Sequence, residues 1–140
     1  KSVNEINLYD SATILLEDEI DVSRGDMFSS IDNEPQISDS ISAKICWMDE
    51  KPLDIKKKYL FKHCNKTSKA IIKNILHKID METLEQISAE NTLDMNDIGQ
   101  VEIRLQNEIV FDSYSKNKNT GSFILINIDS NNTVAAGTIL

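Results

Sequence analysis

The sequence predicts an all-β protein built around an antiparallel β-barrel of the Greek-key type. Apolar and polar residues alternate with a period of two through 40–47 and through 101–106, which is typical of strands with one face in a core. Two β-rich runs, 122–128 and 133–140, flank the turn formers Asp129-Ser130-Asn131-Asn132 and predict a hairpin. A chain of 140 residues is also long enough to bury a real core.

The N-terminal residues are expected to belong to a different β domain from the rest. Strand candidates at 12–17 and 27–31 lie on either side of a polar segment that contains Arg24-Gly25-Asp26. The composition then shifts at 32–36, a polar stretch with a proline, which is typical of a linker. We therefore expect residues 1–36 to be the C-terminal part of one β-barrel plus a linker, and residues 37–140 to be a complete second barrel.

The middle of the chain is predicted to continue the barrel. Residues 59–63 form a strand candidate with aromatic side chains on one face. The isoleucines of 68–79 fit a helical stripe or a bulged strand, and the stiffness of isoleucine at χ1 favours the strand. Residues 81–90 have few β-branched side chains, so we expect a short helical turn there. Residues 123–126 are apolar on both faces, which predicts a central strand or one covered on its outer side.

The composition bears on partners and location. Net charge is −8 and only Arg24 and Arg104 are arginines, so no binding of nucleic acid is expected. The apolar runs are too short to span a bilayer, so no membrane association is expected. Two cysteines, Cys46 and Cys64, are too few for a disulfide scaffold and favour a reducing cytoplasm. The chain starts at Lys1 without a secretion signal, and we expect it to be cut from a longer protein.

The glycines and the Asn-Lys pairs do not form a known nucleotide-binding loop. None of the four glycines is spaced as a phosphate loop requires. Asn65-Lys66 and Asn117-Lys118 resemble the start of a guanine-recognition motif, but both lack the aspartate two residues later. No cofactor-binding residue is therefore predicted.

Candidate metal and catalytic groups are also better explained by structural roles. Residues 94–99 begin like a calcium loop, but its twelfth place is Leu105 instead of a bidentate Glu, so we expect a turn. His63 and Cys64 are adjacent in a predicted strand and should point to opposite faces, which prevents them from sharing a metal. The acidic clusters 17–19 and 49–50 are expected to be solvated loop charge. No catalytic or metal-binding residue is predicted.

Seven short segments, spread over nearly the whole chain, carry a resemblance to a known family. They are 16–26 (LEDEIDVSRGD), 46–53 (CWMDEKPL), 80–85, 96–99, 111–114, 119–126 and 135–137. In order and spacing they resemble the large, GTPase subunit of bacterial sulfate adenylyltransferase, the first matching the end of its second domain and the next the start of its third. The resemblance implies an elongation-factor-like fold, with 1–36 part of a domain-2-like barrel plus linker and 37–140 a domain-3-like barrel.

The resemblance also implies a function for the parent protein. That family couples GTP hydrolysis to the synthesis of adenylyl sulfate from ATP and sulfate, in complex with a small catalytic subunit. Its GTP and Mg belong to an N-terminal G domain that precedes these barrels and is missing from these residues, and adenylyl transfer belongs to the small subunit. The chain is thus expected to be a non-catalytic module that supports its own G domain and relays its state to the small catalytic subunit.

Structural turns are expected at eight residues: Ser23, Arg24, Gly25, Asp26, Gly99, Thr120, Gly121 and Ser122. Related translational GTPases place Arg-Gly-Asp, or something close to it, at the turn entering a barrel strand, where glycine adopts a backbone conformation that other residues resist. Two alternatives stay open. One is a tRNA-binding or partner-binding barrel of a translational GTPase, against which the acidic charge speaks. The other is an extracellular adhesion module that uses Arg24-Gly25-Asp26.

Overall fold

The protein is described by a computed structural model over residues 5–7, 10–89 and 91–140. The described residues form one 3-10 turn and seven strands, with no α-helix, which confirms the all-β prediction. The elements are η1 (Ile31–Asn33), β1 (Gln36–Trp47), β2 (Lys58–His63), β3 (Lys66–Ile79), β4 (Gln86–Ile87), β5 (Ile98–Phe111), β6 (Ser122–Asn127) and β7 (Thr133–Ile139). Within these ranges, no helix is long and apolar enough to cross a membrane.

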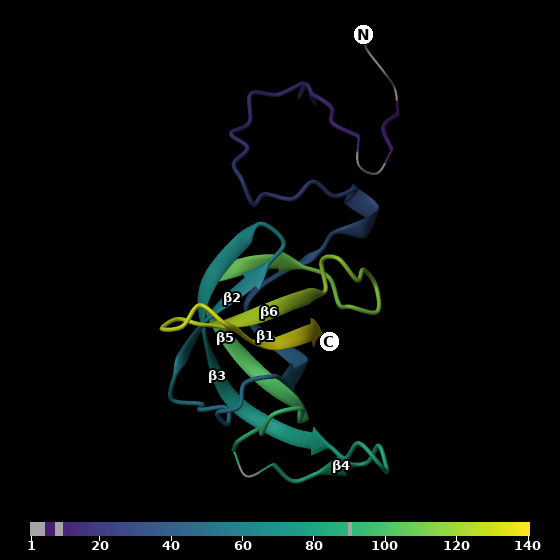
Figure 1. Ribbon diagram of the computed structural model, residues 1–140. Coiled ribbons are helices and arrows are strands. Elements are labelled where there is room, and N and C mark those ends of the chain that lie inside the picture. The colour runs from purple at the N-terminus through teal and green to yellow at the C-terminus, as the bar shows by residue number, and fades with distance from the viewer. Residues whose placement is uncertain (1–4, 8–9, 90) are drawn as a thin grey trace.

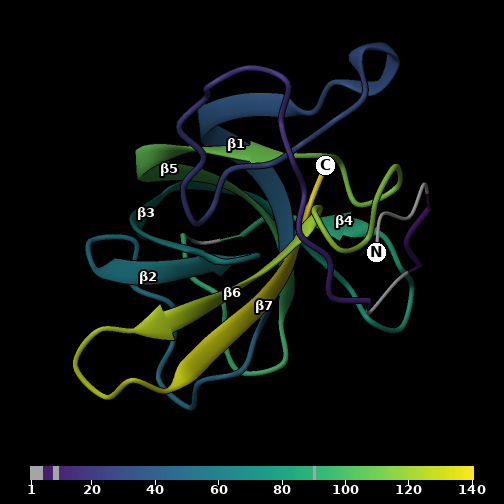
Figure 2. The same ribbon diagram turned by 90° about the horizontal axis from the view of Figure 1, so that it is seen from above.

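Six of the strands close into an antiparallel barrel, as predicted. They are hydrogen-bonded in the order β2-β6-β7-β1-β5-β3, and β3 pairs again with β2, which closes the ring (Figures 1 and 2). The short β4 pairs only with the end of β3 and extends the sheet beyond the barrel. Closure pairs the strand edges with one another, so each strand has an inner face toward the core and an outer face toward solvent.

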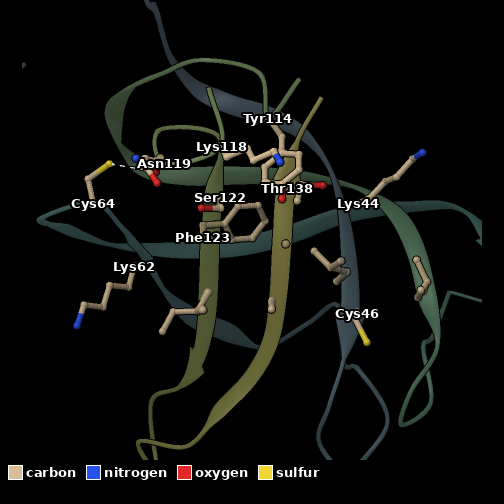
Figure 3. Close-up of a pocket in the computed structure, with 15 residues that line it drawn as sticks. Lys44, Cys46, Lys62, Cys64, Tyr114, Lys118, Asn119, Ser122, Phe123 and Thr138 are labelled. Atoms are coloured by element: carbon tan, nitrogen blue, oxygen red, sulfur yellow. Dashed lines mark hydrogen bonds between the residues drawn. The ribbon is translucent and has the colours of Figure 1, made fainter. Parts of the chain in front are cut away.

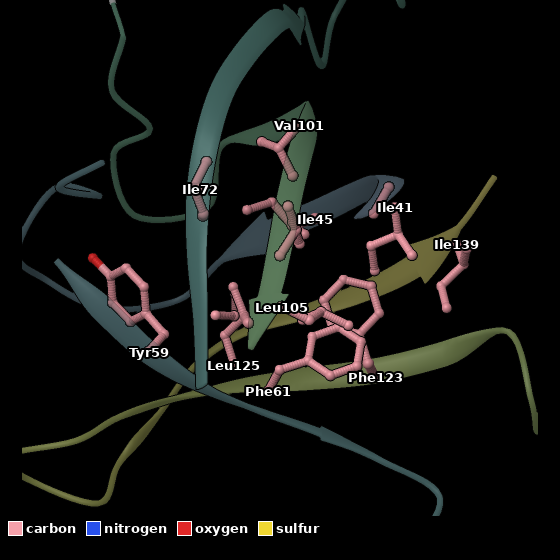
Figure 4. Packing of buried hydrophobic residues seen from close by; sticks show 14 of the residues in the cluster. Ile41, Ile45, Tyr59, Phe61, Ile72, Val101, Leu105, Phe123, Leu125 and Ile139 are labelled. Atoms are coloured by element: carbon pink, nitrogen blue, oxygen red, sulfur yellow. The ribbon is translucent and has the colours of Figure 1, made fainter. Parts of the chain in front are cut away.

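The alternating side chains fill the inside of the barrel. Ile41, Ala43, Ile45 and Trp47 of β1 all point into the core and are buried. Near its centre, Phe61 stacks on Phe123 with ring centroids 4.5 Å apart (Figure 4). Gly137 makes room for this pair, because a Cβ at that position would lie 2.4 Å from Phe123 Cζ. Burial of each such ring contributes about 1.5–3 kcal/mol of transfer free energy.

One end of the barrel is closed by loops whose polar groups are satisfied. Trp47 is buried, and its indole Nε1 donates a hydrogen bond of 2.8 Å to the Lys51 carbonyl. The loop 48–57 and the segment 91–97 are joined by a 2.9 Å hydrogen bond from the Leu53 amide to the Leu93 carbonyl. Both leucine side chains are buried against the core, so they close this end of the barrel.

The strands expected at 12–17 and 27–31 are not present, and both predictions are wrong in this structure. These residues form no strand, and Leu15 and Ile31 are 89% and 90% exposed. A strand requires a neighbour that satisfies its backbone N–H and C=O groups, and the barrel strands already satisfy one another. Residues 31–33 form the 3-10 turn η1 instead.

The ambiguous middle segment is a strand, as predicted, but the helical turn after it is very short. β3 shifts register against β5 between Ile72 and Asn74 and again between Ile75 and His77, so it is a bulged strand. After β3, the Leu84 amide donates a 2.8 Å hydrogen bond to the Asp80 carbonyl, which makes a single turn. Residues 86–87 then form β4 instead of continuing a helix. β6, which contains 123–126, lies between β2 and β7, as expected of a central strand.

Candidate functional site

The outer face of the barrel carries an open depression of about 800 Å³, which we call the outer hollow (Figure 3). It follows from the register of four neighbouring strands. One row of consecutive cross-strand partners is Lys62, Ile124, Ala136 and Cys46, and the next is Ser122, Thr138 and Lys44. The middle of both rows consists of small or medium side chains, whereas a lysine stands at one end of each row. The surface is therefore hollowed over β6 and β7.

A wall for the outer hollow is provided by the loop between β5 and β6, through Tyr114, Lys118 and Asn119. The Tyr114 amide donates a 2.9 Å hydrogen bond to the Ile139 carbonyl, which ties the loop to the end of β7. Gly121 lies against the same point, since a Cβ there would be 2.4 Å from Tyr114 Cα. The wall is thus held by backbone contacts and is formed in advance of any ligand.

An acidic side chain fastens the two ends of this loop. Asp112 accepts a 2.8 Å hydrogen bond from the Thr120 hydroxyl, and its other carboxylate oxygen lies 3.0 Å from Lys116 Nζ. The hydrogen bond from Lys116, together with that from Thr120, holds the pKa of Asp112 below its usual value. The expected turn residues Thr120, Gly121 and Ser122 therefore lie together where this loop enters β6, and their structural role remains a prediction.

The outer hollow is positively charged although the chain is acidic. Lys44, Lys62 and Lys118 line it, and no lining residue is a carboxylate. The ion pairs among the described residues involve other cations, namely Lys78, Arg104 and Lys116. Residues 1–35 contain nine acidic and two basic residues, a charge of −7, whereas residues 36–140 contain fourteen acidic and thirteen basic residues, a charge of −1. The barrel itself is nearly neutral, so its outer face can carry a local positive field.

His63 and Cys64 lie together, which contradicts the expectation that they point to opposite faces. Cys64 is in the turn after β2 with a φ of 48°, so the alternation of the strand no longer holds, and its Sγ lies 3.8 Å from His63 Nε2. His63 Nε2 also lies 2.7 Å from the Thr120 carbonyl, which only accepts, so this nitrogen carries a proton and cannot take one from the thiol. Burial raises the pKa of Cys64, which keeps the thiol protonated. The contact between His63 and Cys64 therefore does not activate the thiol.

The residues 23–26 form a local turn beside the barrel. The Ser23 amide donates a 2.8 Å hydrogen bond to Asp26 Oδ2, and the Asp26 amide donates one of 3.1 Å to the Ser23 carbonyl. Gly25 has a φ of 102°, in the region that favours glycine, and lies against the side chain of Lys66. The role of Arg24 in this turn remains a prediction.

In the segment that resembles a calcium loop, residues 94–99, the acidic side chains interact with a lysine. Lys78 Nζ bonds to Asp97 and lies 3.9 Å from Asp94. Asp97 also accepts a 2.7 Å hydrogen bond from the Asp94 amide, which closes a turn. Gly99 is in β5, where a Cβ would lie 2.8 Å from the buried Leu93 side chain. Within residues 5–7, 10–89 and 91–140, no group of three or more His, Cys, Asp or Glu side chains is arranged to hold a metal ion.

The sequence alone does not reveal the outer hollow. Its lysines belong to different strands and to a loop, so only the register brings them together. The one sequence feature that points to it is the run Ala135-Ala136-Gly137, because small side chains in a strand leave a depression in the barrel surface.

The chain is similar to known proteins over most of its length. A family model described as GTP-eEF1A C-terminal domain-like matches residues 40–140. Sulfate adenylyltransferase subunit 1 of Bacteroides thetaiotaomicron is 42% identical over 138 residues, which cover 93% of this chain and 28% of that protein. The bifunctional enzyme CysN/CysC of Mycobacterium tuberculosis is 39% identical over 131 residues, which cover 93% of this chain and 21% of that protein. The chain thus spans less than a third of these relatives.

Solved structures support the same fold at lower identity. The structure of sup35 complexed with GDP matches with a TM-score of 0.69 and 17% identity, over 79% of this chain and 27% of that one. Translation elongation factor SelB from Methanococcus maripaludis matches with a TM-score of 0.57 and 19% identity, over 79% of this chain and 24% of that one. At such identity the likeness shows the fold alone.

Proposed function

The chain belongs to the GTP-eEF1A C-terminal domain-like family, and from this premise we propose that it is the C-terminal barrel region of the GTPase subunit of a sulfate adenylyltransferase. The observation that carries the proposal is the identity of 39% to 42% with sulfate adenylyltransferase subunit 1 and CysN/CysC proteins over 93% of the chain. That similarity extends beyond residues 40–140 into the N-terminal segment. We therefore assign residues 1–36 to the end of a domain-2-like barrel plus linker and residues 37–140 to a domain-3-like barrel.

The proposed role is support and relay, with the chemistry in other parts of the assembly. GTP with Mg would be held by a G domain, and a small catalytic subunit would form adenylyl sulfate from ATP and sulfate. A closed barrel suits this role, because paired strands move as one body and transmit a shift at one face to another. Because it would use ATP and GTP, we expect the proposed assembly to act in the cytoplasm.

The test uses the full-length protein that contains this chain, purified with its small subunit. Adenylyl sulfate formation from ATP and sulfate is measured with GTP, with a non-hydrolysable GTP analogue, and without nucleotide. We expect synthesis to be stimulated by GTP and much less by the analogue. Equal synthesis under all three conditions, or none at all, would refute the assignment.

A second candidate is a tRNA-binding barrel of a translational GTPase, and one observation favours it. The barrel is nearly neutral, so the acidic charge that argued against RNA lies mainly outside it. Its only arginine is Arg104, however, which limits two-point contacts to phosphates. A filter-binding titration of the barrel with tRNA distinguishes the two candidates, because salt-sensitive binding at about micromolar affinity or tighter would support the RNA reading.

A further inference from the structure

We propose that the outer hollow is a docking site for an extended segment of a partner protein in which acidic and apolar residues alternate along one face, at every second position. This inference goes beyond the proposed function and does not depend on it. It rests on three features of the hollow, which are an apolar floor, a border of lysines without carboxylates, and a wall that is already fixed.

The floor offers an apolar surface of limited depth. Ile124, Ala136, Cys46 and Ile98 follow one another as cross-strand partners on β6, β7, β1 and β5. Ala136 is exposed at the middle of this row, and Ile124 is half-buried. Exposed apolar surface framed by polar groups is typical of an interaction site. A leucine-sized or isoleucine-sized side chain of a partner would bury this surface.

Positive charge borders the floor on three sides. Lys62 comes from β2 and Lys44 from β1, and the order of the strands places β6 and β7 between them. Lys118 comes from the wall loop, above the floor in Figure 3. With no carboxylate in the lining, the three charges attract anionic groups at the borders of an apolar floor. An extended strand that alternates acidic and apolar residues along one face, at positions i, i+2 and i+4, matches this spacing of charge and floor, because every second side chain points to the same side.

The chemistry of the border favours a peptide over a nucleic acid. All three cations are lysines, which bind as point charges and lack the planar fork that suits phosphates. Tyr114 is the one aromatic side chain exposed at the wall, whereas single-stranded nucleic acids require a series of stacking platforms. The apolar floor has no counterpart in a phosphate backbone.

The fixed wall lowers the cost of binding. Tyr114 is held through its backbone by Ile139, and Asp112 fastens the loop to Thr120 and Lys116. A loop that is ordered before binding loses little conformational freedom when a segment docks.

The test measures the binding of a short fluorescent peptide in which acidic residues (Glu or Asp) and apolar residues (Leu or Ile) alternate at every second position with Ser between them, by anisotropy with the full-length protein. The matched probe has Gln and Asn in place of the acidic residues, and a single-stranded RNA serves as the third probe. Two variants alter the site. The triple variant Lys44→Glu, Lys62→Glu, Lys118→Glu reverses its charge, and Ala136→Trp fills the floor without changing the charge. The control reverses the same charge elsewhere, with Lys51→Glu, Lys56→Glu and Lys57→Glu, all exposed on the loop 48–57.

We expect the unaltered protein to bind the acidic peptide. Each site variant should lower the affinity for this peptide by about tenfold or more, whereas the control variant should change it by less than about twofold. In the unaltered protein, backbone NMR shifts upon peptide addition should concentrate at Ile124, Ala136 and Thr138, which locates the site even if a variant misfolds. The proposal is overturned if the acidic peptide does not bind, if the uncharged peptide binds equally well, or if the control loses as much affinity as the site variants. It is also overturned if Ala136→Trp binds normally or if RNA binds more tightly than the peptide.

Discussion

The N-terminal segment, residues 10–35, and the barrel, residues 36–140, are both rich in β-forming residues, yet only the barrel forms strands. In the segment, Ile14, Leu15, Ile20 and Ile31 are exposed, and the backbone–backbone hydrogen bonds are those of local turns. In the barrel, the inward-facing side chains of the same kind are buried, and every strand has a partner on the ring. The difference shows that residues with high β propensity form a strand only where a neighbouring strand pairs with their backbone N–H and C=O groups.

The largest difference between the two regions should appear in truncations of apolar side chains. Phe61→Ala removes a ring that is 0% exposed and stacks on Phe123, and we expect a loss of about 3–5 kcal/mol in the free energy of unfolding. Leu15→Ala in the N-terminal segment should change it by less than about 0.5 kcal/mol. Urea titrations followed by tryptophan fluorescence measure both. Similar losses in the two variants would contradict the contrast.

A smaller difference is expected at two glycines that stand at turns. Gly121→Ala places a Cβ against the backbone of Tyr114, which has no room to move, so we expect a loss of about 1–3 kcal/mol. Gly25→Ala in the N-terminal segment strains a backbone with φ of 102°, but its Cβ meets only the flexible side chain of Lys66. Its cost should fall on the local turn and leave the global unfolding transition within about 0.5 kcal/mol of the parent. Thermal melts of both variants compare the two effects, and a larger loss at Gly25 would reverse our ranking.

The pH dependence of stability should report on the loop that walls the outer hollow. The pKa of Asp112 is lowered in the folded protein, so its ionised form stabilises the fold above the unfolded pKa of about 3.9, and this stability is lost as pH falls through the folded pKa. We expect Asp112→Asn to cost about 1 kcal/mol at neutral pH, because its partner Lys116 is partly exposed. Unfolding measured from pH 7 to about pH 3 should show the difference between the parent and Asp112→Asn shrinking. A constant difference would show that the charge of Asp112 is not responsible.

The smallest effect is expected from removal of most of the N-terminal segment. A chain that starts at residue 31 keeps η1 and Glu34, whose carbonyl accepts a 3.4 Å hydrogen bond from Lys116 Nζ. Its barrel should keep the same circular dichroism spectrum and unfold within about 1 kcal/mol of the parent. An unfolded or aggregated product would show that the segment contributes to the fold.

Much of the barrel was predictable because its signals are local. The alternation in 40–47 and the turn formers at 129–132 determine which residues face inward and where the chain reverses, and both predictions are confirmed. The strands expected at 12–17 and 27–31 failed because pairing depends on a distant partner that a local pattern does not reveal.

The site was less accessible from the sequence for a related reason. Lys62, Ile124 and Ala136 become neighbours only through the register of three strands. The contact of Cys64 with His63 depends on one backbone angle, a φ of 48° at Cys64. The net charge of −8 also gives no indication of a positive surface on the barrel, because most of this charge lies in a segment outside the barrel.

The contrast between the two regions is tested most directly by amide hydrogen exchange of the intact chain, resolved by residue. We predict slow exchange for the paired amides of β1, β5, β6 and β7, with protection approaching that of global unfolding, and exchange near the unprotected rate for residues 10–30. Protected amides at 12–17 and 27–31, as slow as those in the barrel, would show that the N-terminal segment forms strands after all and would contradict the account.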